Sequence, residues 1–534
     1  MKVKNTKLAG VLLIIVAMVA MMIPMTTVAA PPDSGTLVIH KYVMPDKSTA
    51  GPAGTGEVTD KATVPSDAQP LDGVTFDIYK VDLTDGGAYP VSDANHPIEL
   101  TDPTDPSQGF EDSTYPTAVH FDVGSTPAAS ITTANNATYG DGVAVAADLP
   151  QGVYLVVERG GNPDVDAPSD PFIVALPMTN ADGDGYLDPV HVYPKNEKLT
   201  VEKSVETSSV AVGDSVNFTI TPAVPSDLAS TTGYKVTDTL DSALTFDSVT
   251  SVKAATSKAG LAAASELSSS YYDVSETGQT VTVNFTAAGL KYLADNGIRY
   301  LQIVLKATVN SEITNATHNN EVTNTASIDF TNKYGDEKTV DSDSVTIHTA
   351  SIKVVKKDAS SGDLLAGAEF KIASSATNAK NNEFLREDPT TGIIYDYDST
   401  VGSKYVTLGE TNDLMVSANT SADTFIGLKD FTRSGATKTP ETYYLVETKA
   451  PASYNILTSP VAVTFGSNAD TTPTKANNWT ITITVNDNKG FLLPLTGAAG
   501  VAVFTIVGVV LVGLAIALTV NMRKKKEATV QASK

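Results

Sequence analysis

The chain is 534 residues long, contains no cysteine and carries a formal net charge of -24 at pH 7. The lack of cysteine excludes disulfide bonds, and the negative charge argues against binding to nucleic acid, which requires a basic surface. On length alone, we expect about three domains.

Residues 1–30 have the composition of a secretory signal peptide. Three lysines within the first seven residues precede an apolar run over 8–25, and small residues follow at 27–30. This order of charged, apolar and small segments is typical of a segment removed during secretion. We therefore expect cleavage near Ala29 or Ala30 and exclude residues 1–30 from the fold.

The body of the chain is rich in short strand-like segments. Runs of Val, Ile and Thr, bounded by Gly, Asn, Asp and Pro, recur throughout it. This pattern predicts an all-β protein of tandem immunoglobulin-like sandwiches. We place a first domain at 31–197, a middle domain at 198–349 and a last domain at 350–491.

Each domain places polar residues on faces that strand alternation turns inward. In the first domain these are Lys41 and Glu158, and within Val190–Asn196 the alternation directs Asn196 inward and Lys195 outward. The middle domain repeats the pattern on three separate strands, with Lys203, Asp238 and Asn324. In both domains a lysine, an acid and an asparagine are therefore expected in one core.

Burial makes a lysine, an acid and an asparagine in contact chemically reactive. A buried lysine loses its proton more readily, whereas a buried carboxyl group keeps its proton. The neutral amine can then attack the side-chain amide of the asparagine, whose carbonyl group the acid polarises. This attack forms an amide bond between the two side chains and releases ammonia. The alternative is a buried ion pair beside a hydrogen-bonded asparagine.

The last domain has the same ingredients but an unsettled register. Lys356 and Glu447 share apolar faces of their strands. On the final strand, strict alternation selects Asp487 as their partner, whereas Asn486 or Asn488 requires a bulge.

An acidic segment between these motifs is a candidate calcium loop. Asn180, Asp182 and Asp184 alternate, and Gly185 follows where calcium loops turn. However, the twelfth position is His191 rather than Glu, and a strand follows. An acidic β-turn is the favoured interpretation, and no other cofactor is expected.

The C-terminal segment, 493–534, combines a short motif, an apolar span and a basic tail. The motif is Leu493-Pro494-Leu495-Thr496-Gly497. It is followed by 23 apolar residues, 498–520, which as a helix reach roughly 34 Å and can cross a bilayer. The basic cluster at 523–526 is expected to stay in the cytoplasm, so that everything before the motif lies outside. An ordinary membrane anchor is the alternative.

Together these features resemble the sortase-assembled backbone pilins of Gram-positive bacteria, with their collagen-adhesin-like domains. The resemblance implies a CnaA-like middle domain and a CnaB-like last domain. It also implies intramolecular isopeptide bonds, each promoted by an acid: Lys203–Asn324 with Asp238, and Lys356–Asn486 (or Asn488) with Glu447. A third bond, Lys41–Asn196 with Glu158, is the corresponding expectation for the first domain, and its absence is the alternative because not all related first domains have one. For the last domain the resemblance rests on residues 443–454, which are similar to the glutamate box of pilins. The resemblance favours Asn486 over Asp487 as the partner of Lys356.

The segment Val192–Asn196 is similar to the pilin motif of these subunits. By that resemblance a sortase cleaves between Thr496 and Gly497 and passes the Thr496 carbonyl to Lys195 of the next subunit. A free lysine has a pKa of about 10.4 and is mostly protonated. Because no residue of the chain obviously lowers this pKa, we expect the sortase to do so.

The resemblance further implies the partners and location of the protein. They are a pilin-specific class C sortase, a housekeeping sortase, identical subunits, tip and basal pilins, an unknown host-surface ligand, and a fimbria anchored to the cell wall. A monomeric wall-anchored adhesin, binding a host matrix or salivary ligand, is the alternative. An enzyme is not expected, because the six histidines form no recognisable zinc or hydrolase motif.

Overall fold

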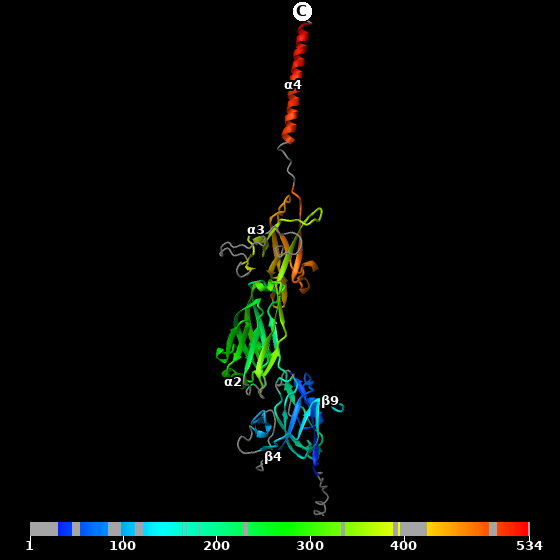
Figure 1. Ribbon diagram of the computed structural model, residues 1–534, viewed down its shortest axis with the longest axis vertical. Helices are drawn as coiled ribbons and strands as arrows, with labels where there is room; N and C mark the ends of the chain where they lie inside the picture. Colours follow the sequence, from blue (N-terminus) through cyan, green and yellow to red (C-terminus); the bar gives the residue numbers. More distant parts are fainter. Residues whose placement is uncertain are drawn as a thin grey trace, which may run out of the picture. The chain divides into compact units, whose positions relative to one another are not determined.

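The computed structural model describes residues 30–44, 54–83, 98–112, 121–226 (without 163, 167 and 181), 228, 233–332, 337–387, 394–395, 424–490 and 499–531. The predicted signal peptide, apart from Ala30, and the motif at 493–497 lie outside these residues. The chain divides into two compact units. The first comprises 1–350, 391–393 and 427–437, and the second comprises 351–390, 394–426 and 438–534. Strands dominate both units (Figure 1).

The N-terminal part of unit 1 contains two main sheets. The first has the order β15 (Val190–Val192), β1 (Ser34–His40), β10 (Gly140–Pro150) and β9 (Ala134–Asn136). The second has the order β12 (Phe172–Leu176), β11 (Gly152–Glu158), β4 (Thr75–Leu83) and β7 (Phe121–Val123), and β8 (Ala129–Thr132) also pairs with β4. Alternate side chains of β1, β4, β10 and β11 form a buried apolar core.

A small third sheet carries the segment that resembles a pilin motif. It has the order β16 (Lys195–Glu197), β2 (Tyr42–Met44) and β3 (Gln69–Pro70). β16 runs parallel to β2, with Lys195 opposite Tyr42 and Asn196 opposite Val43. The remaining elements are β5 (Ile98–Leu100), β6 (Phe110–Asp112), β13 (Met178–Thr179), β14 (Tyr186–Leu187) and the 3₁₀ turns η2 (Val58–Thr63) and η3 (Pro106–Gln108).

The rest of unit 1 has its own sheets and its own core. One sheet has the order β17 (Val201–Val205), β18 (Ser215–Pro222), β23 (Tyr300–Val309) and β20 (Leu244–Ala255). The other has the order β21 (Tyr272–Thr277), β22 (Thr280–Phe285), β19 (Tyr234–Thr239), β25 (Ala326–Thr331) and β26 (Glu337–Asp341). β24 (Glu321–Asn324), β27 (Val345–His348), α2 (Ala287–Asp295), η5 (Lys258–Ala263), η6 (Ser269–Tyr271) and η7 (Ser311–Thr314) complete it. The buried members of this core all lie between Leu199 and Phe330.

The last third of the chain contains two three-stranded sheets. They have the orders β32 (Thr424–Leu428), β28 (Ala350–Asp358), β37 (Thr480–Asp487), and β29 (Glu369–Ala373), β35 (Thr442–Lys449), β36 (Val461–Thr464). β28 and β37 are parallel, with Lys356 opposite Val485. The smaller elements are α3 (Ala376–Asn381), β30 (Arg386–Glu387), β31 (Ile394–Tyr395), β33 (Phe431–Ser434), β34 (Thr437–Pro440), η9 (Ala469–Thr471) and η10 (Lys475–Asn477).

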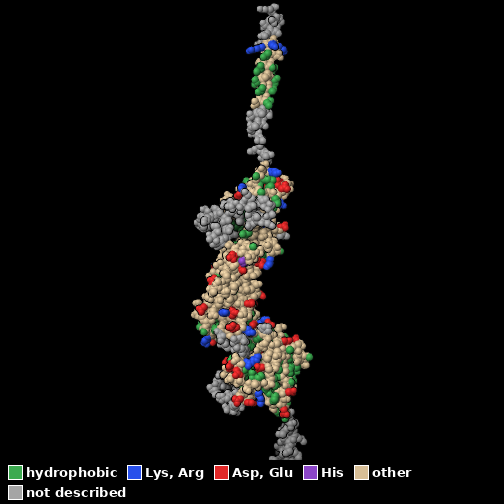
Figure 2. Space-filling view, viewed as in Figure 1, with side chains coloured by type: hydrophobic (Ala, Val, Ile, Leu, Met, Phe, Trp, Pro, Cys, Tyr) green, Lys and Arg blue, Asp and Glu red, His purple; other side chains and the backbone are tan. Residues whose placement is uncertain are grey.

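One long helix, α4 (Ala499–Gln531), follows these sheets. Its segment Thr505–Lys525 has a mean hydropathy of 2.3 and is long enough to cross a membrane. Figure 2 shows hydrophobic side chains along this helix and a ring of Lys and Arg side chains at its end. The sheets and this helix confirm the predicted all-β class with a C-terminal apolar span.

Candidate functional site

The structure brings Lys41, Glu158 and Asn196 together in the N-terminal part of unit 1; we call them the first triad. Lys41 lies between β1 and β2, Glu158 ends β11 and Asn196 is the middle residue of β16. Lys41 Nζ is 2.7 Å from Glu158 Oε2 and also donates to Asn196 Oδ1. Asn196 Nδ2 donates to Glu158 Oε1 at 2.5 Å. All three residues are at most 1% exposed, so strand alternation predicted their convergence correctly.

The surroundings of the first triad keep its acid ionised. Besides the triad contacts, Ser169 donates to Glu158 Oε2 from its backbone N at 3.0 Å and from Oγ at 2.6 Å. Burial alone raises the pKa of Glu158, but the Lys41 charge and the hydrogen bonds from Lys41, Ser169 and Asn196 outweigh burial and lower it below its usual value. Glu158 is therefore a carboxylate at neutral pH.

Lys203, Asp238 and Asn324 form the middle triad. Lys203 Nζ lies 2.5 Å from Asp238 Oδ2, and Asn324 Nδ2 donates to the same oxygen at 3.5 Å. The ring of Phe218 covers the amine, with Nζ 5.3 Å from the ring centroid. Among the residues that the structure describes, Asp238 Oδ1 and Asn324 Oδ1 are buried without a hydrogen-bond partner. A simple ion pair thus leaves this group incompletely satisfied.

Electrostatics move the middle triad toward its neutral forms. Burial lowers the pKa of Lys203, and the nearby Asp238 carboxylate only partly opposes this. Burial likewise raises the pKa of Asp238, against the influence of Lys203 and Asn324. Both shifts favour an uncharged amine beside a protonated acid, the state in which the amine is nucleophilic and the acid can polarise an amide.

The last triad consists of Lys356, Glu447 and Asp487. Lys356 Nζ is 2.9 Å from Glu447 Oε1 and 3.2 Å from Asp487 Oδ2, and the side chains are at most 3% exposed. These contacts are short but poorly aligned, since neither Nζ nor the two oxygens has a partner in hydrogen-bond geometry among the described residues. Leu457 N donates to Glu447 Oε2 at 2.8 Å.

The expectation that Asn486 or Asn488 reaches Lys356 is wrong. β37 pairs with β28 over eight consecutive residues with no register shift, so that strict alternation holds along it. The side chains of Asn486 and Asn488 are exposed, and the buried position between them is Asp487. A bulge would have been needed to turn either asparagine inward, and the strand has none.

Lys195 lies on the face of β16 opposite Asn196, but it is only half exposed. Its Nζ donates to the carbonyl oxygen of Tyr193 at 3.1 Å. Burial lowers the pKa of Lys195, and the negative charge of Asp60 opposes that effect. The expectation that no part of the chain lowers this pKa is therefore wrong, because partial burial beside the η2 segment already does so.

Two histidines next to this segment form a contact that the sequence did not predict. His40 Nε2 and His191 Nδ1 are 2.9 Å apart, and both rings are buried. The ring of Tyr193 stacks on His40 with centroids 4.6 Å apart. Burial and the neighbouring His191 lower the pKa of His40 to about 4. Ser169 was missed as well, since it lies in a loop without periodicity.

The candidate calcium residues occupy the turn between β13 and β14. Asn180 Nδ2 donates to Asp184 Oδ1 at 2.9 Å, and the backbone N of Asp184 and Gly185 donate to Asn180 Oδ1. Within the described ranges, no group of three or more His, Cys, Asp or Glu residues is arranged to hold a metal ion. The acidic β-turn stays the favoured prediction, and calcium binding at Asn180, Asp182 and Asp184 stays its alternative. A calcium titration that leaves the melting temperature unchanged would remove the calcium site.

Comparison with known proteins agrees with the predicted fold class and with the predicted wall anchor. Residues 32–197 match the family model "Gram-positive pilin subunit D1, N-terminal domain", 350–480 match "Prealbumin-like fold domain" and 485–528 match "LPXTG cell wall anchor motif". The chain is 28% identical to fimbrial subunit type 2 of Actinomyces naeslundii, over 92% of the chain and 90% of that protein. The chain is also 28% identical to fimbrial subunit type 1 of Actinomyces viscosus, over 92% of the chain and 91% of that protein.

The fold has a relative among solved structures. The full-length major pilin SpaD from Corynebacterium diphtheriae matches with a TM-score of 0.50 and 24% identity, over 86% of this chain and 98% of that one. Fold, anchor and inward lysine–acid groups define a wall-anchored, multidomain β-sandwich subunit. The matched domains, the anchor motif and the fimbrial relatives support this chain as a sortase-assembled major pilin of Gram-positive bacteria. It is a structural shaft subunit of a cell-wall-anchored pilus rather than an enzyme.

Proposed function

We propose that the shaft grows by an amide bond between Thr496 of one subunit and Lys195 of the next. A sortase thiol cleaves the Thr496–Gly497 peptide bond and holds the Thr496 carbonyl as a thioester. The Lys195 amine attacks that carbonyl carbon, loses a proton and releases the thiol. Support comes from the half-buried Lys195, whose pKa is lowered by burial, on the strand that directs Asn196 inward.

We further propose that each triad forms an isopeptide bond. Lys203 Nζ attacks the side-chain carbonyl carbon of Asn324 and ammonia leaves, with Asp238 as the acid. In the last triad, Lys356 Nζ attacks the carboxyl carbon of Asp487 and water leaves, with Glu447 as the acid. The first triad joins Lys41 to Asn196 with Glu158 as the acid. The observation that carries this proposal is the burial of three lysines, each against an acid and a carbonyl-bearing side chain.

Polymer linkage is tested on boiled wall extracts by denaturing gel electrophoresis. The wild-type chain should give a ladder of multiples, and Lys195→Ala should collapse it to one band. Lys198→Ala is a matched control, because Lys198 is three residues away, 52% exposed, and paired only with Asp164 among the contacts described. A persisting ladder in Lys195→Ala would overturn the linkage. A single band from the wild type would favour a monomeric wall-anchored adhesin.

The intramolecular bonds are tested by intact mass of the secreted body. Once all three bonds have formed, two through asparagine and one through Asp487, they have removed two ammonia molecules and one water, about 52 Da in total. Asp487→Ala should restore about 18 Da of that deficit. Asn486→Ala should keep the full deficit, because the Asn486 side chain is exposed. A mass equal to the sum of the unmodified residues would remove the proposal.

The partners follow from the same assembly. A pilin-specific class C sortase joins the subunits, a housekeeping sortase attaches the finished polymer to the wall, and tip and basal pilins cap its ends. The pilus supports adhesion to a host surface. Support comes from the wall-anchor match and from the fimbrial relatives. Adhesion that is unchanged in a strain lacking this gene would contradict that role.

A further inference from the structure

The short strand β16 carries three side chains with three different surroundings. Lys195 is half-buried and faces away from the core, and Asn196 is buried in the first triad. Glu197 shares a face with Lys195 and is 1% exposed. Its carboxylate forms an ion pair with Arg299 and accepts a hydrogen bond from Ser226 N at 3.0 Å. Both partners, Arg299 and Ser226, belong to the middle domain, which follows β16 in the sequence.

Backbone pairing alone specifies the register of β16 weakly. β16 has three residues, its partner β2 has three, and β3 has two. A slip of one residue in a strand turns every side chain to the opposite face. Such a slip would direct Lys195 toward Glu158 and turn Asn196 outward, which would remove both the acceptor amine and the amide of the first triad.

Arg299 is well placed to prevent that slip. Its backbone N donates to Ala255 O at 3.0 Å and its carbonyl accepts from Val224 N at 2.8 Å, directly before β23. On the other side, Leu199 N donates to Asp166 Oδ2 at 2.8 Å, which fastens the chain two residues after Glu197. Glu197 is thus held against an anchored guanidinium, which adds a side-chain contact to the backbone hydrogen bonds that flank β16, from Tyr42 N to Pro194 O and from Lys198 N to Met44 O.

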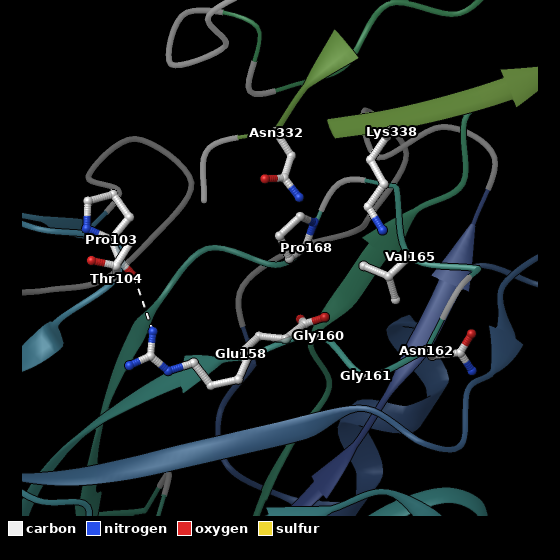
Figure 3. Close-up of a pocket in the computed structure, with 11 residues that line it drawn as sticks. Pro103, Thr104, Glu158, Gly160, Gly161, Asn162, Val165, Pro168, Asn332 and Lys338 are labelled. Atoms are coloured by element: carbon white, nitrogen blue, oxygen red, sulfur yellow. Dashed lines mark hydrogen bonds between the residues drawn. The ribbon is translucent and has the colours of Figure 1, made fainter. Parts of the chain in front are cut away.

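A cavity of about 300 Å³ lies at the same junction. Glu158 and the Gly160–Gly161 turn line it from the first domain, and Asn332 and Lys338 from the middle domain, as Figure 3 shows. The middle domain therefore contributes side chains to the cavity that Glu158 also lines, as well as the partners of Glu197.

We propose that the Glu197–Arg299 ion pair is a register lock for β16. It holds Glu197 in place so that Asn196 meets Lys41 and Lys195 faces the incoming subunit. Arg299 and Glu197 are positioning residues in this scheme, since neither touches the reacting atoms. The inference rests on the proposed function of Lys195 and of the first triad, and it adds a requirement for the middle domain.

The test compares Glu197→Ala and Glu197→Gln with the wild-type full-length chain in cells that polymerise it. Peptide mapping by mass spectrometry measures the fraction of Lys41–Asn196 cross-link, and a denaturing gel measures polymer. A displacement of about 1 Å at reacting groups slows a reaction by about 10²-fold, so we expect at least a tenfold loss of both products in Glu197→Ala. Glu197→Gln, which keeps the shape and one acceptor oxygen, should restore part of each.

Two controls separate register from folding. The Lys203–Asn324 cross-link, within the same chain, should stay complete in both variants if the middle domain is folded. Asp77→Ala removes another carboxylate–arginine pair of the first domain, Arg159–Asp77 at 3.1 Å, and should leave the Lys41–Asn196 fraction and the ladder unchanged. Equal losses in Asp77→Ala and Glu197→Ala would overturn the register lock in favour of general destabilisation.

The outcomes also separate this inference from the proposed function. If the wild-type chain forms both products and Glu197→Ala forms them at the same rate, only the register lock fails. If the wild type lacks the Lys41–Asn196 cross-link and Lys195→Ala still polymerises, the proposed function itself fails.

Discussion

The first and middle triads contain the same kinds of residue, but the pKa values of their acids shift in opposite directions. In the middle triad, burial dominates, and the pKa values of Lys203 and Asp238 both move toward neutral forms. In the first triad, the charge of Lys41 and several donors, Ser169 among them, outweigh burial and keep Glu158 ionised. Contact among a lysine, an acid and an asparagine therefore does not by itself fix the pKa of the acid, which also depends on the donors around it. We expect these donors to influence how readily the proposed amide bond forms.

This comparison predicts that the middle triad reacts without assistance, whereas the first triad reacts more slowly. A deprotonated acid is a poor polarising group for an amide. Slower reaction of the first triad leaves β16 free of a covalent bond while Lys195, next to Asn196, is still an acceptor.

The largest effect is expected from Asp238→Ala. Without the acid the Lys203–Asn324 bond should not form, and the intact mass should rise by about 17 Da relative to the wild type after correction for the substitution. The bond closes a loop of about 120 residues, so its loss should cost roughly 4 to 5 kcal/mol in the free energy of unfolding, by analogy with disulfides. Chemical denaturation measures this cost.

Glu158→Ala is the matched variant for the first triad. If the two sites differ as described, Glu158→Ala should change the mass of freshly purified monomer less than Asp238→Ala does, because less of the first bond is present at that stage. Equal and complete ammonia loss at both sites in freshly made protein would contradict the predicted difference in reaction rate between the two triads.

A smaller effect is expected from Ser169→Ala. The variant removes the 2.6 Å hydrogen bond from Oγ to Glu158 but keeps the one from the backbone N. Hydrogen bonds to charged groups contribute about 1.5 to 3 kcal/mol, so the pKa of Glu158 should rise and the Lys41–Asn196 bond should form on the order of tenfold faster. A time course of intact mass after purification measures the rate. An unchanged or slower rate would show that ionisation of Glu158 is not what limits the first triad.

Strand alternation was sufficient to predict most of these sites, because it depends only on neighbouring residues. The pattern of apolar and polar residues along each strand directs Lys41, Asn196 and Lys203 inward, and all three side chains are buried. The same pattern selects Asp487, and the error arose from preferring a family pattern over the alternation of an uninterrupted strand.

The residues that sequence reasoning missed share a physical cause. Ser169 acts from a loop, and Arg299 reaches Glu197 across 102 residues of sequence. Partial burial of Lys195 depends on how the η2 segment packs near it. None of these contacts has a period or a spacing in the chain, because each is created only when separate elements pack together.

The smallest predicted effect is a loss of stability at acidic pH. It should be larger in the first domain than in the middle domain. The pKa of His40 is lowered from its ordinary value to about 4 by burial and by His191, whereas in the unfolded chain it is about 6.5. A lowered pKa means that stability is fully present above pH 6.5 and is lost as the pH falls toward 4. After allowing for solvent screening, we expect a loss on the order of 1 to 2 kcal/mol for the first domain over this range.

Thermal unfolding between pH 7 and pH 4 should therefore show a steeper decline for the wild type than for His40→Gln, which cannot gain a proton there. Glu158, whose pKa is lowered, also loses stability in acid, but it does so in both proteins and cancels from the difference. Because His40 directly precedes Lys41, hydrogen exchange at β1 should report the same acid-dependent loosening. Parallel pH profiles for the two proteins would mean that protonation of His40, 2.9 Å from His191, costs no folding stability. In that case acid would destabilise the first and middle domains alike.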